Sequence, residues 1–158
     1  MVVLLLLGEL LSDYAGMYTV EIVALNGEDH YSAQGQKEYL EQNAGKFDEI
    51  LFDVNMDGVG YKEGKTAYSF YNLPPEIMTV VRKVFSSQEG AVEGEQWYQS
   101  DHMIFVQNGI PAVAITSDQF MHLSAHITHT PEDTPDLIDV NKLVALAWSL
   151  KTLFNTLK

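Results

Sequence analysis

Acidic side chains and histidines gather at three places in this sequence, and each place follows an apolar run. Glu28, Asp29 and His30 follow the run at 19–25. Asp57 follows the run at 50–54, and a histidine-rich stretch at 122–134 follows the run at 110–116. Carboxylates and imidazoles hold metal ions and carry protons in enzymes. If the runs are parallel strands, their carboxyl ends meet at one edge of a sheet, where such groups can converge.

The stretch DVNMDGVGYKEG at 53–64 has the alternation of acids seen in the first half of an EF-hand calcium loop. Asp53, Asn55 and Asp57 fit that half, but Gly64 occupies the twelfth position, where the loop needs a glutamate. The flanking segments have the pattern of strands, whereas an EF-hand has a helix on each side. We therefore interpret the stretch as strand, turn and strand.

The histidine-rich stretch and the adjacent acids each allow two interpretations. His122, His126 and His129 can share a helix face, but the H-E-x-x-H pattern fails because Leu123 follows the first histidine. Such histidines are commonly surface residues, and a pair such as Glu28-Asp29 is commonly a solvated loop. In the functional interpretation, one acid of the pair binds a metal and the other takes a proton from water.

The composition limits the classes of function. Twenty-two acidic and nine basic residues among 158 give a formal charge of −13, which disfavours binding to nucleic acids and to anionic membrane surfaces. The absence of cysteine excludes disulfides, thiolate metal ligands and a cysteine nucleophile. A metal would have to be held by His, Asp and Glu. The length predicts one domain, 1–158.

The apolar amino-terminal run MVVLLLLGELL predicts a buried helix packed on a sheet. It lacks a basic lead and a cleavage site and is interrupted by Glu9, so it is not typical of a signal peptide, and it is too short to span a bilayer. A domain that opens inside its own core leads us to expect that a preceding part is missing.

Helices and strands alternate along the chain, which predicts an α/β fold with a mostly parallel sheet covered on both faces. We expect further helices at 32–47, 75–88 and 140–157, and strands at 19–25, 50–54, 65–73 and 110–116. Tyr39 and Leu40 are expected to face inward, and 89–96 is expected to be a mobile loop. The last helix has an apolar face made of Val140, Leu143, Leu146, Leu150 and Leu153.

Four segments in order carry a resemblance to a known family: VEIVALNGED, ILFDVNMDGVGY, SDHMIFVQNGIPAVAI and HTPEDTPDLIDVNKL. Together they resemble the carboxyl-terminal two-thirds of the catalytic domain of M28-type zinc aminopeptidases, over roughly 2–157. The resemblance implies a three-layer α/β/α sandwich of the zinc-exopeptidase type with a mostly parallel mixed sheet. It also implies a peptide substrate and two zinc ions in the complete family site.

Carried over residue by residue, the resemblance implies that Glu28 is the general base and acid. Asp29 and His129 would bind one zinc ion, and Asp57 would bind the other, with Asn55 and Gly58 shaping the turn. Asp101 and His102 fall where the family has supporting or substrate-side polar groups. His122 and His126 match no functional position of the family, and we interpret them as structural.

The chain also departs from the family pattern. The upstream His-x-Asp and Ala-x-Asp-Asn-like segments do not occur in this sequence, so three of the five expected ligands are present and one zinc ion or none is expected to be retained. Asp29 stands where a glutamate is usual, and YSAQGQ replaces Gly-Leu-x-Gly-Ser.

Three hypotheses follow from this pattern. The first is the catalytic region of a zinc aminopeptidase, incomplete in this chain. The second is a non-catalytic module on the same fold, and the third is an acyl-transfer or cyclising enzyme. An incomplete sheet also predicts self-association through an exposed edge.

Overall fold

Within the described residues, the sheet has four strands in the order β1-β4-β2-β3. The computed structural model describes residues 1–27 and 32–157. The strands are β1 (Asp53–Met56), β2 (Thr66–Tyr71), β3 (Ala91–Glu93) and β4 (Ala112–Ser117). The pairs β1–β4 and β2–β3 are parallel, and β2–β4 is antiparallel. The predicted α/β class with a mostly parallel mixed sheet is confirmed.

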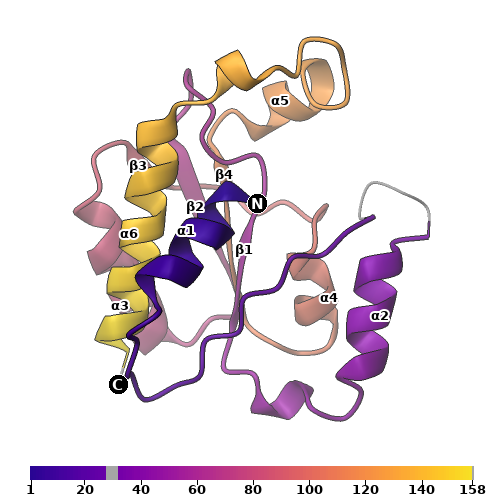
Figure 1. Cartoon of the computed structure of the whole chain (residues 1–158), viewed down its shortest axis with the longest axis vertical. Helices are drawn as coiled ribbons and strands as arrows, with labels where there is room; N and C mark the ends of the chain where they lie inside the picture. Colours follow the sequence, from indigo (N-terminus) through magenta and orange to yellow (C-terminus); the bar gives the residue numbers. More distant parts are fainter. Residues whose placement is uncertain (28–31, 158) are drawn as a thin grey trace.

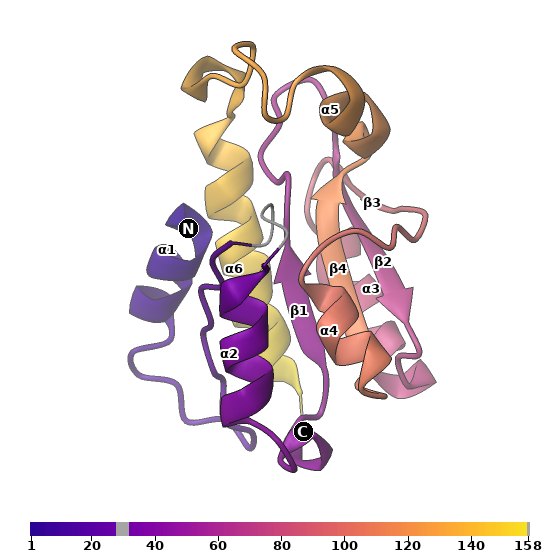
Figure 2. The ribbon, with the colours of Figure 1, turned by 90° about the vertical axis from the view of Figure 1, so that its right-hand side faces the viewer.

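Helices cover both faces of the sheet (Figures 1 and 2). One side carries α1, α3 and α6, and the other carries α2 and α4, while α5 lies beyond one end of the strands. The helices are α1 (Val2–Leu10), α2 (Gln34–Gln42), α3 (Pro75–Ser86), α4 (His102–Gln107), α5 (Phe120–His126) and α6 (Val140–Thr156), with short 3-10 turns η1 (Phe47–Glu49) and η2 (Pro135–Leu137). Among the described residues, no helix is long and apolar enough to cross a bilayer.

The central strand β4 contributes to the packing on both faces. Val113 and Ile115 belong to the large apolar core on the α1, α3 and α6 side, whereas Ala112 and Ala114 belong to a smaller cluster on the other side. This division follows from the pleat, because successive side chains of a strand point to opposite faces. All six residues of β4 are buried, so the alternation is one of side-chain size and not of polarity.

The predicted helices at 75–88 and 140–157 are confirmed as α3 and α6. Pro75 stands in the first turn of α3, where its missing N–H costs no helical hydrogen bond. The side chain of Asp139 caps α6 by accepting from the backbone N–H of Asn141 at 2.9 Å. Leu146, Leu150 and Leu153 are buried as expected, but Val140 is exposed because the first turn of α6 extends past the sheet.

Two expectations about strands and loops are wrong. No strand forms at 19–25, and this segment is not paired with any described strand. Isolated β propensity does not make a strand without such a partner. The expected loop at 89–96 contains β3, whose short length and mixed composition hid its pairing with β2.

The amino-terminal run does form a helix, but only one side of it is buried. In α1, Val3 and Leu7 lie in the core, whereas Val2 and Leu5 are exposed. Helix α1 packs against α6 and touches the edge of the large core. In α2, Tyr39 and Leu40 are half-buried and pack against the cluster that contains Phe105 of α4.

Candidate functional site

Asp57 directly follows β1, at the carboxyl end of the strand. Its backbone N–H donates to the carbonyl of Ile115 in β4 at 3.0 Å, and its side chain is exposed. The next residue, Gly58, has φ +62°, and a Cβ there would lie 3.2 Å from the hydroxyl of Thr116. Glycine suits this turn both by its left-handed backbone and by the close approach of β4.

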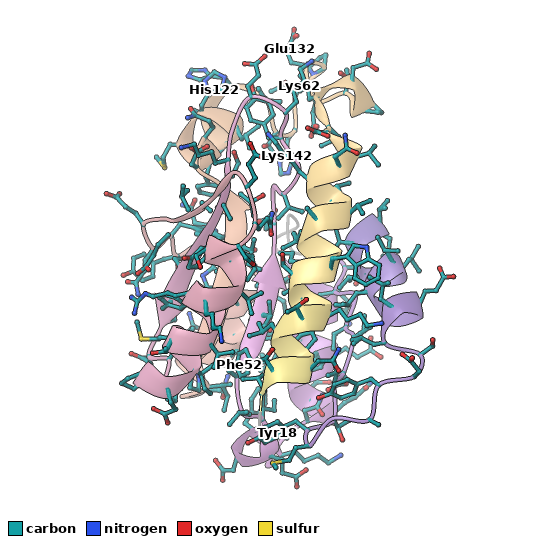
Figure 3. All side chains as sticks on the ribbon, turned by 90° about the vertical axis from the view of Figure 1, so that its left-hand side faces the viewer. Tyr18, Phe52, Lys62, His122, Glu132 and Lys142 are labelled. Carbon is teal, nitrogen blue, oxygen red and sulfur yellow. The ribbon has the colours of Figure 1, made fainter. Side chains whose placement is uncertain are left out.

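The loop that begins at Asp57 is tied down by Lys142 of α6. The Lys142 ammonium donates to the carbonyl oxygens of Tyr61 (2.7 Å), Lys62 (2.8 Å) and Gly64. The backbone adds a bridge between Tyr61 and Ile138. Figure 3 shows Lys142 and Lys62 at the same end of the molecule as His122. The loop bearing Asp57 is therefore attached to the segment that leads from His129 into α6.

A buried histidine, His102, contacts Asn55 of β1. His102 is fully buried, and its Nε2 lies 2.9 Å from the carbonyl of Trp97. Because a carbonyl only accepts, Nε2 carries the proton, and the unprotonated Nδ1 faces the amide nitrogen of Asn55 at 3.4 Å. The same amide donates to Ser100 Oγ at 3.0 Å. Asn55 thus links β1 to the start of α4, rather than shaping the turn as expected.

Burial lowers the pKa of His102, and three influences oppose this shift: the hydrogen bond to Trp97 and the negative charges of Asp57 and Asp101. The ring is therefore held neutral by its surroundings. It contacts the rings of Tyr71 and Trp97 at centroid distances of 4.6 and 5.1 Å. His102 is thus positioned to support neighbouring groups from within the fold rather than to meet substrate at the surface.

Asp101 and Asp53 are two acidic residues whose charges interact with each other. Asp101 is half-buried and accepts a hydrogen bond from Gln36 of α2 at 2.8 Å. Burial, with a further contribution from the charge of Asp101, raises the pKa of Asp53 to about 7. In the described part of the structure, Oδ2 of Asp53 is buried without a hydrogen-bond partner. A carboxyl group in this setting favours its protonated form.

The remaining predicted site residues are His129, Glu28 and Asp29. His129 is exposed in the loop after α5 and has φ +63°, an uncommon backbone for a residue other than glycine. Glu28 and Asp29 lie outside the described residues. The structure therefore brings Asp57, Asp101 and His102 into one electrostatic neighbourhood, and the predicted roles of Glu28, Asp29 and His129 stay predictions.

A zinc site needs three or four protein ligands of the nitrogen, oxygen or sulfur type. Asp57 and His129 offer suitable donors, but residues 1–27 and 32–157 contain no group of three or more His, Asp or Glu side chains that could hold a metal ion. The described residues by themselves do not fit a complete zinc site. The expected third donor, Asp29, is not among them.

The fold and Asp57 at the end of β1 together define an α/β domain of the class that places its site beyond the carboxyl ends of the strands. The model of peptidase family M28 matches residues 1–153, and the chain belongs to this family. The resemblance inferred from the four sequence segments is thereby confirmed.

A solved structure gives the same fold. The aminopeptidase from Aneurinibacillus sp. strain AM-1 superposes with a TM-score of 0.76 at 22% sequence identity. The match covers 96% of this chain and 36% of that chain, so this chain spans little more than a third of the length of the relative. At this identity the likeness shows the fold alone. No curated protein matches the sequence.

Sequence reasoning missed two residues that shape this end of the molecule, Lys142 and Ser100. The signal for Lys142 was weak, because a lysine near the start of an amphipathic helix usually lies in solvent. Ser100 stands directly before Asp101 and His102, and its contact with Asn55 depends on two segments far apart in the chain.

Proposed function

We propose that this chain acts in zinc-dependent peptide hydrolysis of the aminopeptidase type, removing amino-terminal residues from peptides. The match to peptidase family M28 over residues 1–153 is the observation that carries the proposal. The position of Asp57 at the carboxyl end of β1, where its charge acts on His102, supports it.

In this proposal each acidic residue has a distinct role. Glu28 takes a proton from the attacking water and passes it to the leaving amine, a step that contributes typically 10²–10⁴-fold to the rate. Asp29 and His129 would hold one zinc ion, and Asp57 would hold the second ion of the complete family site. Zinc, when bound, polarises the peptide carbonyl and makes hydroxide available near neutral pH.

The surrounding polar residues orient these groups. Neutral His102 holds the carbonyl of Trp97 and faces Asn55, so it keeps the start of α4 in register with β1. Lys142 holds the loop after Asp57 by three backbone carbonyls. An acidic side chain close to the site is also suited to hold the free α-amino group of a peptide.

The experiment compares hydrolysis of a panel of aminoacyl fluorogenic amides by the wild type, Glu28→Gln and Glu49→Gln, with added zinc. Glu49 is an exposed acid in η1, which precedes β1, so it lies before the amino end of the strand whose carboxyl end leads to Asp57. Glu28→Gln should turn over about 10²-fold or more slowly than the wild type, whereas Glu49→Gln should match the wild type. Zinc content after dialysis is measured in parallel for Asp57→Asn and His129→Gln.

The results separate the hypotheses. Turnover that survives in Glu28→Gln contradicts the assignment of the base. If no protein turns over and none retains zinc, the non-catalytic module is favoured. Release of ammonia from peptides with amino-terminal glutamine, without release of the amino acid, indicates the cyclising enzyme. These outcomes are read by fluorescence, metal analysis and mass spectrometry respectively.

We also propose a second copy of this chain as a partner, in addition to the peptide substrate. Among the described strands, β1 and β3 form the two edges of the sheet, and the amino-terminal segment exposes Met17 and Ile22. Unpaired edges and exposed apolar residues favour association. Sedimentation velocity at increasing concentration should show a shift above the monomer value, and a constant monomer value contradicts the proposal.

A further inference from the structure

Helix α5 carries a pair of histidines that the proposed peptidase chemistry does not use. His122 and His126 are one helical turn apart, and both side chains are exposed. Their ring centroids are 5.2 Å apart with an angle of 48° between the ring planes. Residues four apart on a helix lie on the same face, so this proximity follows from the backbone.

The separation of the two rings matches what one metal ion requires. A zinc-type ion lies about 2.0–2.1 Å from each imidazole nitrogen, with a near-tetrahedral angle between them, which places the ring centres roughly 5 Å apart. The rings are already at this separation. A shared ion then requires that one nitrogen of each ring point toward it.

The surroundings of His122 supply room and a carboxylate. An open hollow of about 320 Å³ is lined by Tyr61, Glu63, Gln119 and His122. Glu63 is exposed and accepts a hydrogen bond from the Tyr61 hydroxyl at 3.4 Å. Among the described residues no third His, Asp or Glu side chain lies close enough to share an ion with this pair, so water completes the coordination and Glu63 contributes through that water. The net charge of −13 favours a divalent cation over an anion here.

We propose that His122 and His126 form a surface site for a divalent transition-metal ion of the zinc, nickel and copper class, separate from Asp57 and His129. Imidazole suits these ions, whereas calcium and magnesium prefer oxygen ligands. The site lies on α5, a helix of seven residues that leads into the loop of His129. Because so short a helix is marginal alone, a bound ion that bridges one turn stabilises it.

The test uses Ni²⁺ alone as the probe, with isothermal titration calorimetry and thermal unfolding of the full chain. The wild type should bind Ni²⁺ and unfold at a higher temperature with it. His122→Gln and His126→Gln should each weaken this binding by about tenfold or more, since one imidazole cannot chelate. Glu63→Gln should weaken it by a smaller factor. The double variant Asp57→Asn/His129→Gln should retain it.

A matched control keeps the number of histidines constant. The double variant His126→Gln/Ser124→His moves one ring two positions along α5, where residues do not face His122. It should bind Ni²⁺ no better than His126→Gln. Binding in this control equal to that of the wild type overturns the proposal, as does unchanged binding in His126→Gln. Loss of binding in Asp57→Asn/His129→Gln also overturns it, because the ion then belongs to the family's candidate ligands.

Discussion

The two faces of the sheet are built differently. On the α1, α3 and α6 side, the buried residues form one continuous apolar cluster that includes Phe85, Leu146 and Leu150. On the α2 and α4 side, the apolar residues divide into two smaller clusters. Buried polar groups stand among them, including His102, Ser100 and the carboxyl group of Asp53.

Because of this difference, the two faces are expected to contribute differently to stability and to the chemistry of the site. Continuous apolar packing contributes free energy in proportion to the area removed from water. Buried polar groups contribute less to stability and are costly when unpaired, but they hold particular protonation states and orientations. We therefore expect the α6 face to dominate the free energy of unfolding, and the α4 face to dominate the pH response near the candidate site.

The largest expected effect is on the apolar face. Leu150→Ala should lower the free energy of unfolding by about 3–5 kcal/mol, since Leu150 is 1% exposed in the large cluster. Ile104→Ala, in a small cluster on the α4 face, should cost about 2 kcal/mol. Urea unfolding monitored by circular dichroism measures both. Equal losses would remove the distinction between the faces.

Lys142 connects the apolar face to the loop of Asp57, and its removal should have the next largest effect. Lys142→Met leaves three backbone carbonyls without their ammonium donor, which should cost about 2–3 kcal/mol. Lys37→Met is the control, because Lys37 is exposed and pairs with Glu41 at 3.9 Å. The control should change stability by less than about 0.5 kcal/mol. Similar values for the two variants, again from urea unfolding, would show that the loop is not held by Lys142.

Asp53 should give the α4 face a pH-dependent contribution to stability. Its pKa is raised to about 7 in the folded protein, above the value of about 3.9 in an unfolded chain. The folded state therefore binds the extra proton between these values, and this contribution to stability is lost as pH rises through 7. Asp53→Asn should flatten this slope and stabilise the protein at pH 8 by about 1–3 kcal/mol.

Unfolding of wild type and Asp53→Asn across the range from pH 4 to 8, by urea at each pH, measures the difference. An Asp48→Asn variant is the matched control, because Asp48 is in η1 and is exposed. A slope that is identical in Asp53→Asn and the wild type would contradict the raised pKa.

The smallest expected effect is spectroscopic and concerns His102. Since burial lowers its pKa, the ring should be more than half neutral, with the proton on Nε2, at about pH 6.5, where a free imidazole is half protonated. The ¹⁵N chemical shifts of the ring nitrogens report both features. The opposite tautomer, with the proton on Nδ1, would break the hydrogen bond to Trp97 and the link to Asn55.

Much of the fold was predictable from local pattern. Pro74 and Pro75 predicted the start of α3, and the spacing of Leu146, Leu150 and Leu153 predicted the buried face of α6. Short elements were not predictable, because β3 has only three residues and forms only by pairing with β2. The converse error at 19–25 has the same cause, since a strand needs a neighbour that local composition does not reveal.

The candidate site was likewise predictable only in part from the sequence. The sequence by itself determined which chemical groups are present, such as Asp57 after an apolar strand and His129 in its family segment, and with them membership of peptidase family M28. Only the tertiary structure decided that Asn55 meets Ser100 and His102, and that Lys142 meets the loop after Asp57. These contacts join residues more than 40 positions apart, and their geometry depends on how the helices pack on the sheet, which no local pattern records.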